Sequence, residues 1–311
     1  RKEEDEVEIL SGVFQGHTTG APICMFIRNK AVDSRPYERF KRVPRPGHAD
    51  YTARVKYGGF SDWRGGGRFS GRITASYVMA GSVAKKVLGF ALGVETLAYS
   101  TQIGGIRARE LSPEEIRESR YQNDVRCPDT AAADKMMKAI KEVMKEGDSL
   151  GGVVECLVLY VPTGLGEPVF SSLESDLSRA LFSIPAVKGV EFGKGFNLTE
   201  MKGSESNDPF VLRSGRVVTS TNRMGGILGG ISTGMPLILR VAVKPTASIH
   251  KRQRSVDLED MVETEITVAG HHDPCIVPRV VPVVESVVAI VLTDHALRFG
   301  LIPPVLERDE R

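Results

Sequence analysis

Cysteine is scarce and scattered in this chain. The four cysteines form no C-x-x-C pair, since they stand at Cys24, Cys127, Cys156 and Cys275. This spacing argues against a structural zinc site and against a dense disulfide framework, and it fits a reducing cytoplasm best. No H-x-x-x-H pattern occurs either, so we expect no metal site.

Long apolar runs are also lacking. The most apolar stretch, residues 280–292, contains Pro282 and Glu285 and is followed by Asp294, so it is too short and too polar for a bilayer span. No secretory signal opens the chain. The sequence begins at Arg1 without a methionine. We therefore expect an N-terminally truncated chain of a cytoplasmic protein without a membrane partner.

Charge of one sign is not in excess. The 41 Lys and Arg residues against 39 Asp and Glu give a net charge of +2, which indicates neither a disordered chain nor a nucleic-acid binder. The 311 residues suffice for one large fold with a sizeable core. With no fixed-period repeat and no low-complexity linker, residues 1–311 are predicted to form a single domain.

Common nucleotide and nucleophile signatures do not fit. No G-x-G-x-x-G follows a strand and no G-x-x-x-x-G-K-[ST] occurs, so Rossmann and P-loop interpretations lack support. A G-x-S-x-G match would make Ser232 a hydrolase nucleophile. However, Pro236 and a strand-like run follow it, whereas a nucleophile elbow leads into a helix.

The sequence does contain a mixture of strand and helix patterns. Alternating or fully apolar runs predict strands at residues 7–14, 22–27, 153–161, 216–221, 236–243 and 265–268. Helical spacing with start and stop signals predicts helices at residues 70–90, 128–145, 172–184 and 278–299. Because strands and helices do not alternate strictly, we expect an α+β fold of packed layers.

The densest chemical signal is a basic segment at residues 39–72. It holds nine Lys and Arg residues against only Asp50 and Asp62, and arginine suits bidentate contacts with phosphate or carboxylate. Its glycine run at 65–67 precedes the predicted helix near Ser70, where backbone N–H groups would meet these cations. The segment therefore predicts an anion site; a solvated basic face with a flexible turn is the alternative.

Three further segments could serve a ligand or a proton transfer. The glycine cluster at 225–230 would let a flat or phosphorylated group approach closely, although a tight hairpin is the alternative. Lys244 and the hydroxyls that follow it suit a phosphate. His48 and His272 adjoin charged loop residues, which can tune proton transfer near neutral pH; a structural or merely exposed histidine is the alternative.

Several segments, taken in chain order, resemble chorismate synthase over residues 7–299. They read VEILSGV at 7–13, TTGAP at 18–22, RPGHADYT at 45–52, KYG at 56–58, RGGGR at 64–68, the glycine cluster at 225–230 and HDPC at 272–275. The resemblance implies a layered β-α-β sandwich and a carbon-oxygen lyase of the shikimate pathway. Such an enzyme uses reduced FMN to eliminate phosphate from 5-enolpyruvylshikimate 3-phosphate in a 1,4-anti sense, giving chorismate.

The resemblance also implies roles for single residues. His48 corresponds to a proton donor toward flavin and substrate, and Asp273 to the aspartate implicated, with the flavin, in removing the ring hydrogen. Arg45, Arg72 and Ser70 are the implied substrate ligands. The implied FMN ligands are Arg68, Phe69, Ser70, Pro185, Ala186, Gly229, Lys244, Pro245, Thr246, Ala247, Ser248 and His271.

The resemblance implies a homotetramer as well, with NADPH as a reductant in some members. The family's opening G-[DES]-S-H-G segment, which carries a second catalytic histidine, is not in this sequence, and His271 stands where the family usually has arginine. Two alternatives follow: a flavin-binding protein without lyase activity, and an NAD(P)H-dependent flavin reductase.

Overall fold

The fold is built around one antiparallel sheet. The structure, a computed structural model, describes residues 4–30, 33–270 and 272–306. Its central sheet has the strand order β6-β5-β7-β13-β8. These strands are β5 (Glu95–Ile103), β6 (Ile106–Arg107), β7 (Gly152–Leu159), β8 (Val187–Phe192) and β13 (Leu237–Val243).

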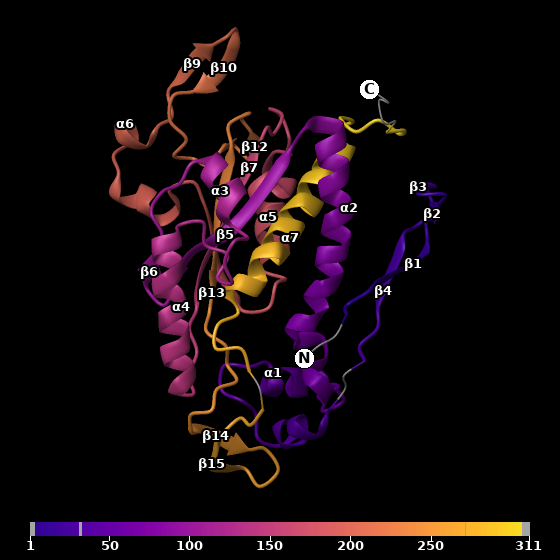
Figure 1. The fold of residues 1–311 in the computed structure, drawn as a ribbon, viewed down its shortest axis with the longest axis vertical. Helices are drawn as coiled ribbons and strands as arrows, with labels where there is room; N and C mark the ends of the chain where they lie inside the picture. The colour runs from indigo at the N-terminus through magenta and orange to yellow at the C-terminus, as the bar shows by residue number, and fades with distance from the viewer. Residues whose placement is uncertain (1–3, 31–32, 271, 307–311) are drawn as a thin grey trace.

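A layer of helices covers one face of this sheet (Figure 1). Its members are α2 (Thr74–Leu92), α5 (Leu173–Leu181) and α7 (Val277–Arg298). Helix α7 lies against β5 and β7 and also contacts α2 and α5. On the other face, α3 (Pro113–Ser119) places Ile116 against Leu97, Tyr99, Leu157 and Leu159. Helix α4 (Thr130–Lys145) packs beside β6.

Helix α7 is the centre of the core. It starts with a proline in its first turn. The N–H groups of a first turn have no partner within the helix, so the proline removes no helical hydrogen bond. Among the described residues it is the one helix long and apolar enough to cross a membrane, yet 78% of that stretch is buried inside the protein. Such burial is typical of a core helix, because a helix that is apolar all round needs cover on every side.

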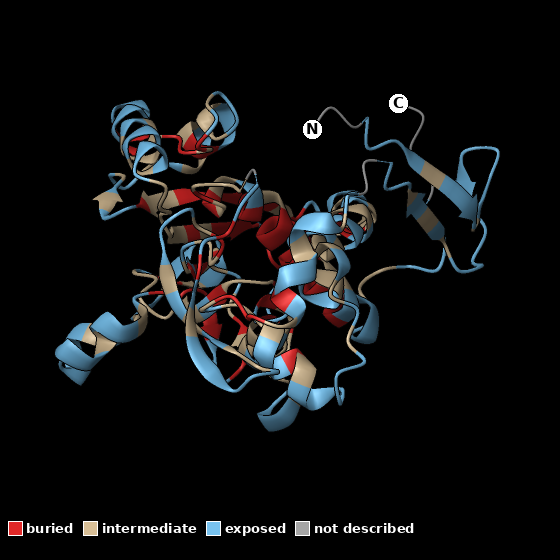
Figure 2. Ribbon diagram, turned by 90° about the horizontal axis from the view of Figure 1, so that it is seen from below, coloured by how far each residue is buried: buried red, intermediate tan, exposed pale blue. Residues whose placement is uncertain are grey.

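Short two-stranded ribbons surround the body. They are β1 (Val7–Ser11) with β4 (Cys24–Ile27), β2 (Val13–Phe14) with β3 (His17–Thr18), β9 (Phe210–Arg213) with β10 (Arg216–Thr219), β11 (Ile227–Leu228) with β12 (Ile231–Ser232), and β14 (Gln253–Asp257) with β15 (Val262–Ile266). Figure 2 shows the β1–β4 ribbon exposed or half-exposed along its length. Ribbon β14–β15 lies at the same end of the molecule as α1 (Asp50–Lys56) (Figure 1). The short α6 (Gly203–Ser206) precedes β9.

The predicted elements are largely present, with some corrections. The four predicted helices correspond to α2, α4, α5 and α7, but α2 begins at Thr74 after a 3-10 turn at Gly71–Ile73. The predicted strand at 265–268 is wrong in position, because the chain pairs over Val262–Ile266 instead. The central strand β5 was not predicted. Its core-facing Thr96 and Ser100 are polar although buried, and they break the apolar pattern.

Close helix packing at Gly81 gives the first test. A Cβ atom at this position would lie 2.2 Å from Cβ and 2.5 Å from Cα of Ser286 on α7, so the two helices would have to separate. We expect Gly81→Ala to lower the free energy of unfolding by about 2 kcal/mol or more, measured by urea denaturation. Gly89→Ala on the same helix meets no atom within 4 Å and should stabilise slightly, because alanine favours helix. Equal effects of the two changes would contradict this packing.

Candidate functional site

A buried arginine joins two of the segments singled out in the sequence. Arg45 is only 6% exposed, and it donates from Nε and Nη2 to the two carboxylate oxygens of Asp50, each at 2.8 Å. Its Nη1 donates to Oγ of Ser248 at 3.0 Å. The guanidinium also lies over the Phe40 ring, 4.2 Å from its centroid. Arg45 therefore holds the 45–50 loop against the 244–248 segment.

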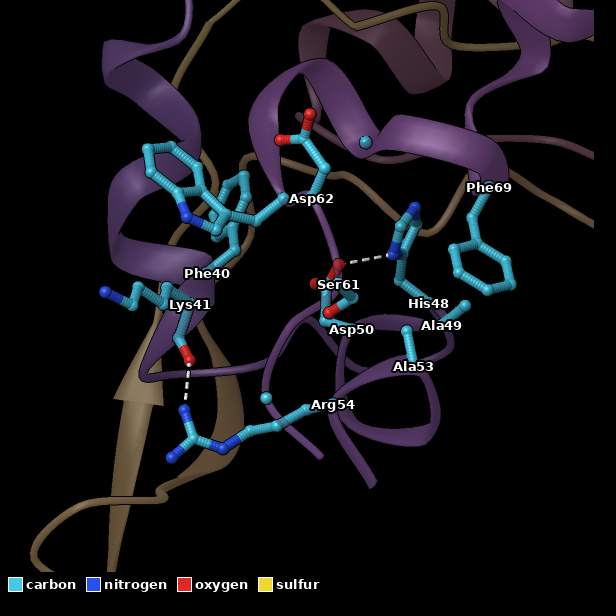
Figure 3. A pocket seen from close by; sticks show the side chains of 13 residues that line it. Phe40, Lys41, His48, Ala49, Asp50, Ala53, Arg54, Ser61, Asp62 and Phe69 are labelled. Carbon is cyan, nitrogen blue, oxygen red and sulfur yellow. Dashed lines mark hydrogen bonds and ion pairs between the residues drawn. The ribbon is translucent and has the colours of Figure 1, made fainter. Parts of the chain in front are cut away.

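The same ion pair orients His48. Its Nδ1 lies 2.6 Å from Oδ1 of Asp50, as Figure 3 shows, and 3.0 Å from Nη2 of Arg45. Burial alone would raise the pKa of Asp50, but hydrogen bonds from Arg45 and His48 outweigh it and hold that pKa well below its usual range. Asp50 is therefore a carboxylate near neutral pH and fixes the ring of His48 by accepting its Nδ1–H.

A small hollow, partly open to solvent, lies beside His48. Aromatic side chains line it from two sides, since Phe40 comes from the turn before the loop and Trp63 and Phe69 from the turn after it. Figure 3 shows His48 and Phe69 on the same side of this hollow. The aromatic rings and the imidazole at this hollow can stack against a flat ring system at the surface.

The segment after β13 closes the site from another direction. Nζ of Lys244 donates to the carbonyl of Gly47 at 3.1 Å. The backbone N–H of Lys244 donates to the carbonyl of Ala186 at 3.0 Å, which brings Pro185 and Ala186 to the same place. The predicted ligand segments at 45–50, 185–186 and 244–248 are thus in contact, although they are far apart in the sequence.

The glycine turn at 64–70 forms a further wall. Gly67 has a φ of 51°, and a Cβ on it would lie 2.3 Å from the carbonyl oxygen of Asp62, so only glycine fits. The turn places Phe69 at the hollow, and Ser70 caps the next turn by accepting from the N–H of Arg72 at 3.3 Å. Within the described ranges, the side chains of Arg68 and Arg72 form no ion pair.

The basic segment is neutralised in part by carboxylates of the chain itself. Arg42 pairs with three carboxylates beside β14, and Arg64 pairs with Asp62 at 2.8 Å. Arg45 is matched by Asp50. Four arginines of this segment, Arg39, Arg54, Arg68 and Arg72, form no ion pair among the described residues. Because Arg39 and Arg54 donate to backbone carbonyls of Glu265 and Lys41, Arg68 and Arg72 are left for an anionic ligand.

Among the described residues, Asp273 and Gly229 do not join this network of contacts. Asp273 accepts from Nη2 of Arg279 at 2.8 Å and makes no contact with His48 in the described part of the chain. Gly229 lies in the β11–β12 turn, near the start of β13, whereas Lys244 follows the end of that strand. Seven strand residues separate these ends by roughly 20 Å. His271 lies outside the described residues.

Comparison with known proteins shows what this arrangement belongs to. The sequence profile of the chorismate synthase family matches residues 1–297. A chorismate synthase of Dehalococcoides mccartyi (strain BAV1) is 54% identical over 308 residues, which cover 99% of this chain and 84% of that protein. One from Korarchaeum cryptofilum is 56% identical over 298 residues, covering 96% and 82%. The chain belongs to the chorismate synthase family.

A solved chorismate synthase structure supports the same assignment. It superposes with a TM-score of 0.71 at 29% sequence identity, covering 94% of this chain and 77% of that chain. The expected α+β fold, the family and the function in the shikimate pathway of aromatic amino-acid biosynthesis are thereby confirmed. Chorismate synthases use reduced FMN and act on 5-enolpyruvylshikimate 3-phosphate.

Two residues that shape this chorismate synthase site are not predicted as site residues. The sequence indicates Asp50 only as a charged neighbour of His48, and it gives no role to Phe40. The spacing Arg-x-x-His-x-Asp is a signal that could have identified Asp50, because one loop can fold the arginine and the histidine onto the carboxylate. Nothing local in the sequence marks Phe40 as the ring beneath Arg45.

Removal of the Asp50 charge gives the second test. Asp50→Asn leaves Arg45 buried without its counter-charge, so we expect the free energy of unfolding at pH 7 to fall by about 3 kcal/mol. Because folding lowers the pKa of Asp50, its stabilisation is present above about pH 4 and is lost as the pH falls below that value. Urea denaturation at several pH values should show the variant and wild type converging in acid. The control is Glu8→Gln, which breaks an exposed ion pair with Arg28 and should change the free energy of unfolding far less. If Asp50→Asn had an equally small effect, the account would be contradicted.

Proposed function

We propose that the segments at 45–50, 64–72, 185–186 and 244–248 form the flavin and substrate site of this chorismate synthase. The observation that carries this proposal is the Arg45 hydrogen-bond network, which joins His48, Asp50 and Ser248 in one cluster. The proposal predicts that ligands bind beside this cluster, in and around the hollow next to His48.

The segment after β13 has groups that fit the phosphate of FMN. Oγ1 of Thr246 is buried and has no hydrogen-bond partner among the described residues, and Lys244 has no carboxylate partner within those residues. A buried hydroxyl without a partner is costly, and a phosphate oxygen would satisfy it. When bound, reduced FMN supplies electron density toward the breaking allylic C–O bond of the substrate.

The arginines divide into positioning and binding groups. Four of the five N–H groups of Arg45 are used by Asp50, Ser248 and Nε2 of His48, which leaves one at Nη1 for substrate. Arg68 and Arg72 are free to contact the carboxylates and phosphate of the substrate. We therefore assign Arg72 and Ser70 mainly to binding and Arg45 mainly to holding His48.

His48 is assigned to proton transfer. Asp50 accepts the hydrogen on Nδ1, so Nε2, which lies 3.2 Å from Nη2 of Arg45, is the ring atom left to exchange a proton with flavin or substrate. Such an imidazole, held by a carboxylate, can give or take a proton near neutral pH.

Replacement of His48 tests this assignment. His48→Ala should lower kcat by about a hundredfold or more, measured with chemically reduced FMN under anaerobic conditions, while the urea midpoint changes little. His17→Ala, at an exposed position on β3, is the matched control and should keep wild-type turnover. Near-normal turnover of the His48 variant would show that this histidine is only structural.

Asp273 is assigned to removal of the ring hydrogen. The side chain of Asp273 pairs with Arg279 but stays 39% exposed, so the carboxylate can be approached from solvent. When Asp273 takes up a proton, its ion pair with Arg279 would weaken.

Replacement of Asp273 tests that role separately from cofactor binding. Asp273→Asn should lower turnover by about a hundredfold or more while the dissociation constant for FMN, measured by calorimetry, stays within about threefold of wild type, a change of less than 1 kcal/mol. Asp134→Asn on the exposed side of α4 serves as the control. Loss of FMN binding in the Asp273 variant would mean that Asp273 serves the cofactor instead.

The proposal includes three properties implied by the family resemblance: a homotetramer, a cytoplasmic location and NADPH as the source of electrons for FMN. The tetramer has some support in the ribbons, where Leu10, Phe210 and Leu212 are between 61% and 76% exposed. Two-stranded ribbons are marginal alone, and contact with other subunits would cover these side chains. We also propose that residues 1–311 act as one domain.

A further inference from the structure

A β-bulge next to the proposed site displays Lys188. In the pairing of β8 with β13, Gly189 opposes Ala242 and Val187 opposes Val243, so Lys188 is an extra residue on β8. Bulges of this kind redirect a side chain and recur beside active sites. Because Val187 and Val243 are buried, the neighbouring Lys188 points away from the core.

The residue before this bulge is held in an unusual conformation. Ala186 has a φ of 72°, which is strained for a residue with a Cβ. Its carbonyl accepts from the N–H of Lys244 at 3.0 Å. The strained turn and the bulge thus hold the start of β8 against the first residue after β13, and they bring two lysines to one edge of the sheet.

These two lysines lack counter-charges. Several basic side chains of the body are paired, as Lys85 is with Glu285 and Arg240 with Glu191. In contrast, neither Lys188 nor Lys244 forms an ion pair in the described ranges. Burial, and then repulsion from Lys188, lowers the pKa of Lys244. Folding therefore keeps two like charges close together at a cost.

Backbone donors lie beside the same lysines. Within the described residues, the N–H groups of Thr246, Ala247 and Ser248 donate to no acceptor, and Oγ1 of Thr246 is buried without a partner. Free N–H groups next to cations can donate to an anion. The geometry therefore offers both charge and hydrogen bonds to a group with several oxygens.

We propose that Lys188 and Lys244 together bind a phosphate monoester dianion, with Lys188 as a ligand that no sequence pattern marked. This inference rests on the proposed function, in which the 244–248 segment lies at the flavin and substrate site. A dianion neutralises both ammonium groups and accepts from the free N–H groups. The phosphate belongs either to FMN or to 5-enolpyruvylshikimate 3-phosphate.

Calorimetric titration of the full-length protein distinguishes these sources. If the phosphate is that of FMN, Lys188→Met should weaken FMN binding by about tenfold or more and leave riboflavin binding unchanged, because riboflavin has no phosphate. If the phosphate is that of the substrate, the same variant should weaken substrate binding by a similar factor and leave FMN unchanged. Lys138→Met, at an exposed lysine of α4, should affect neither.

The result that overturns the inference is equally clear. Unchanged binding of both FMN and substrate by Lys188→Met, in a protein whose wild type binds both, would remove Lys188 from the site and leave the proposed function intact. Failure of the wild type to bind either ligand would overturn the inference together with the proposed function. Equal weakening of FMN and riboflavin would mean that Lys188 acts through folding rather than through phosphate.

Discussion

The buried ion pair between Arg45 and Asp50 is the interaction on which the site depends. A guanidinium that is 6% exposed is tolerated only where its charge and its hydrogen bonds are matched. Asp50 supplies the charge, and Ser248 supplies an acceptor from a segment two hundred residues away along the chain. Because both contacts are made by one rigid planar group, the position of the 45–50 loop fixes that of the 244–248 segment, and His48 is oriented as a consequence.

The scaffold brings these segments to one end of the molecule. The 244–248 segment follows β13, Ala186 precedes β8, and the 64–70 turn leads into α2; the sheet and the packed pair of α2 and α7 fix their positions. Part of the charge is balanced within the chain, since Arg42, Arg64 and Arg240 all have carboxylate partners. At the proposed site, Arg68, Arg72, Lys188 and Lys244 have no carboxylate partner among the described residues, and the carboxylates and phosphate of the substrate and the flavin phosphate would supply their counter-charge.

The sequence predicted most of the fold where local pattern and burial agree. The strands near 153–161 and 236–243 and the helix near 278–299 have long apolar patterns, and each is present. Strand β5 escaped prediction because Thr96 and Ser100 face the core and interrupt its apolar pattern. For the site, ordered motifs named His48 and the 244–248 segment, but they could not show that Asp50 satisfies Arg45. Lys188 was beyond prediction as well, since its direction depends on the register between two strands.

The central claim is that one cluster, organised by Arg45, receives both flavin and substrate. It is tested most directly by a crystal structure of the protein with FMN and 5-enolpyruvylshikimate 3-phosphate bound. The account predicts a phosphate against the 244–248 segment, the flavin ring beside His48, and the Arg45–Asp50 pair intact beneath them. A flavin bound away from this cluster, with no contact to His48 or Lys244, would contradict it.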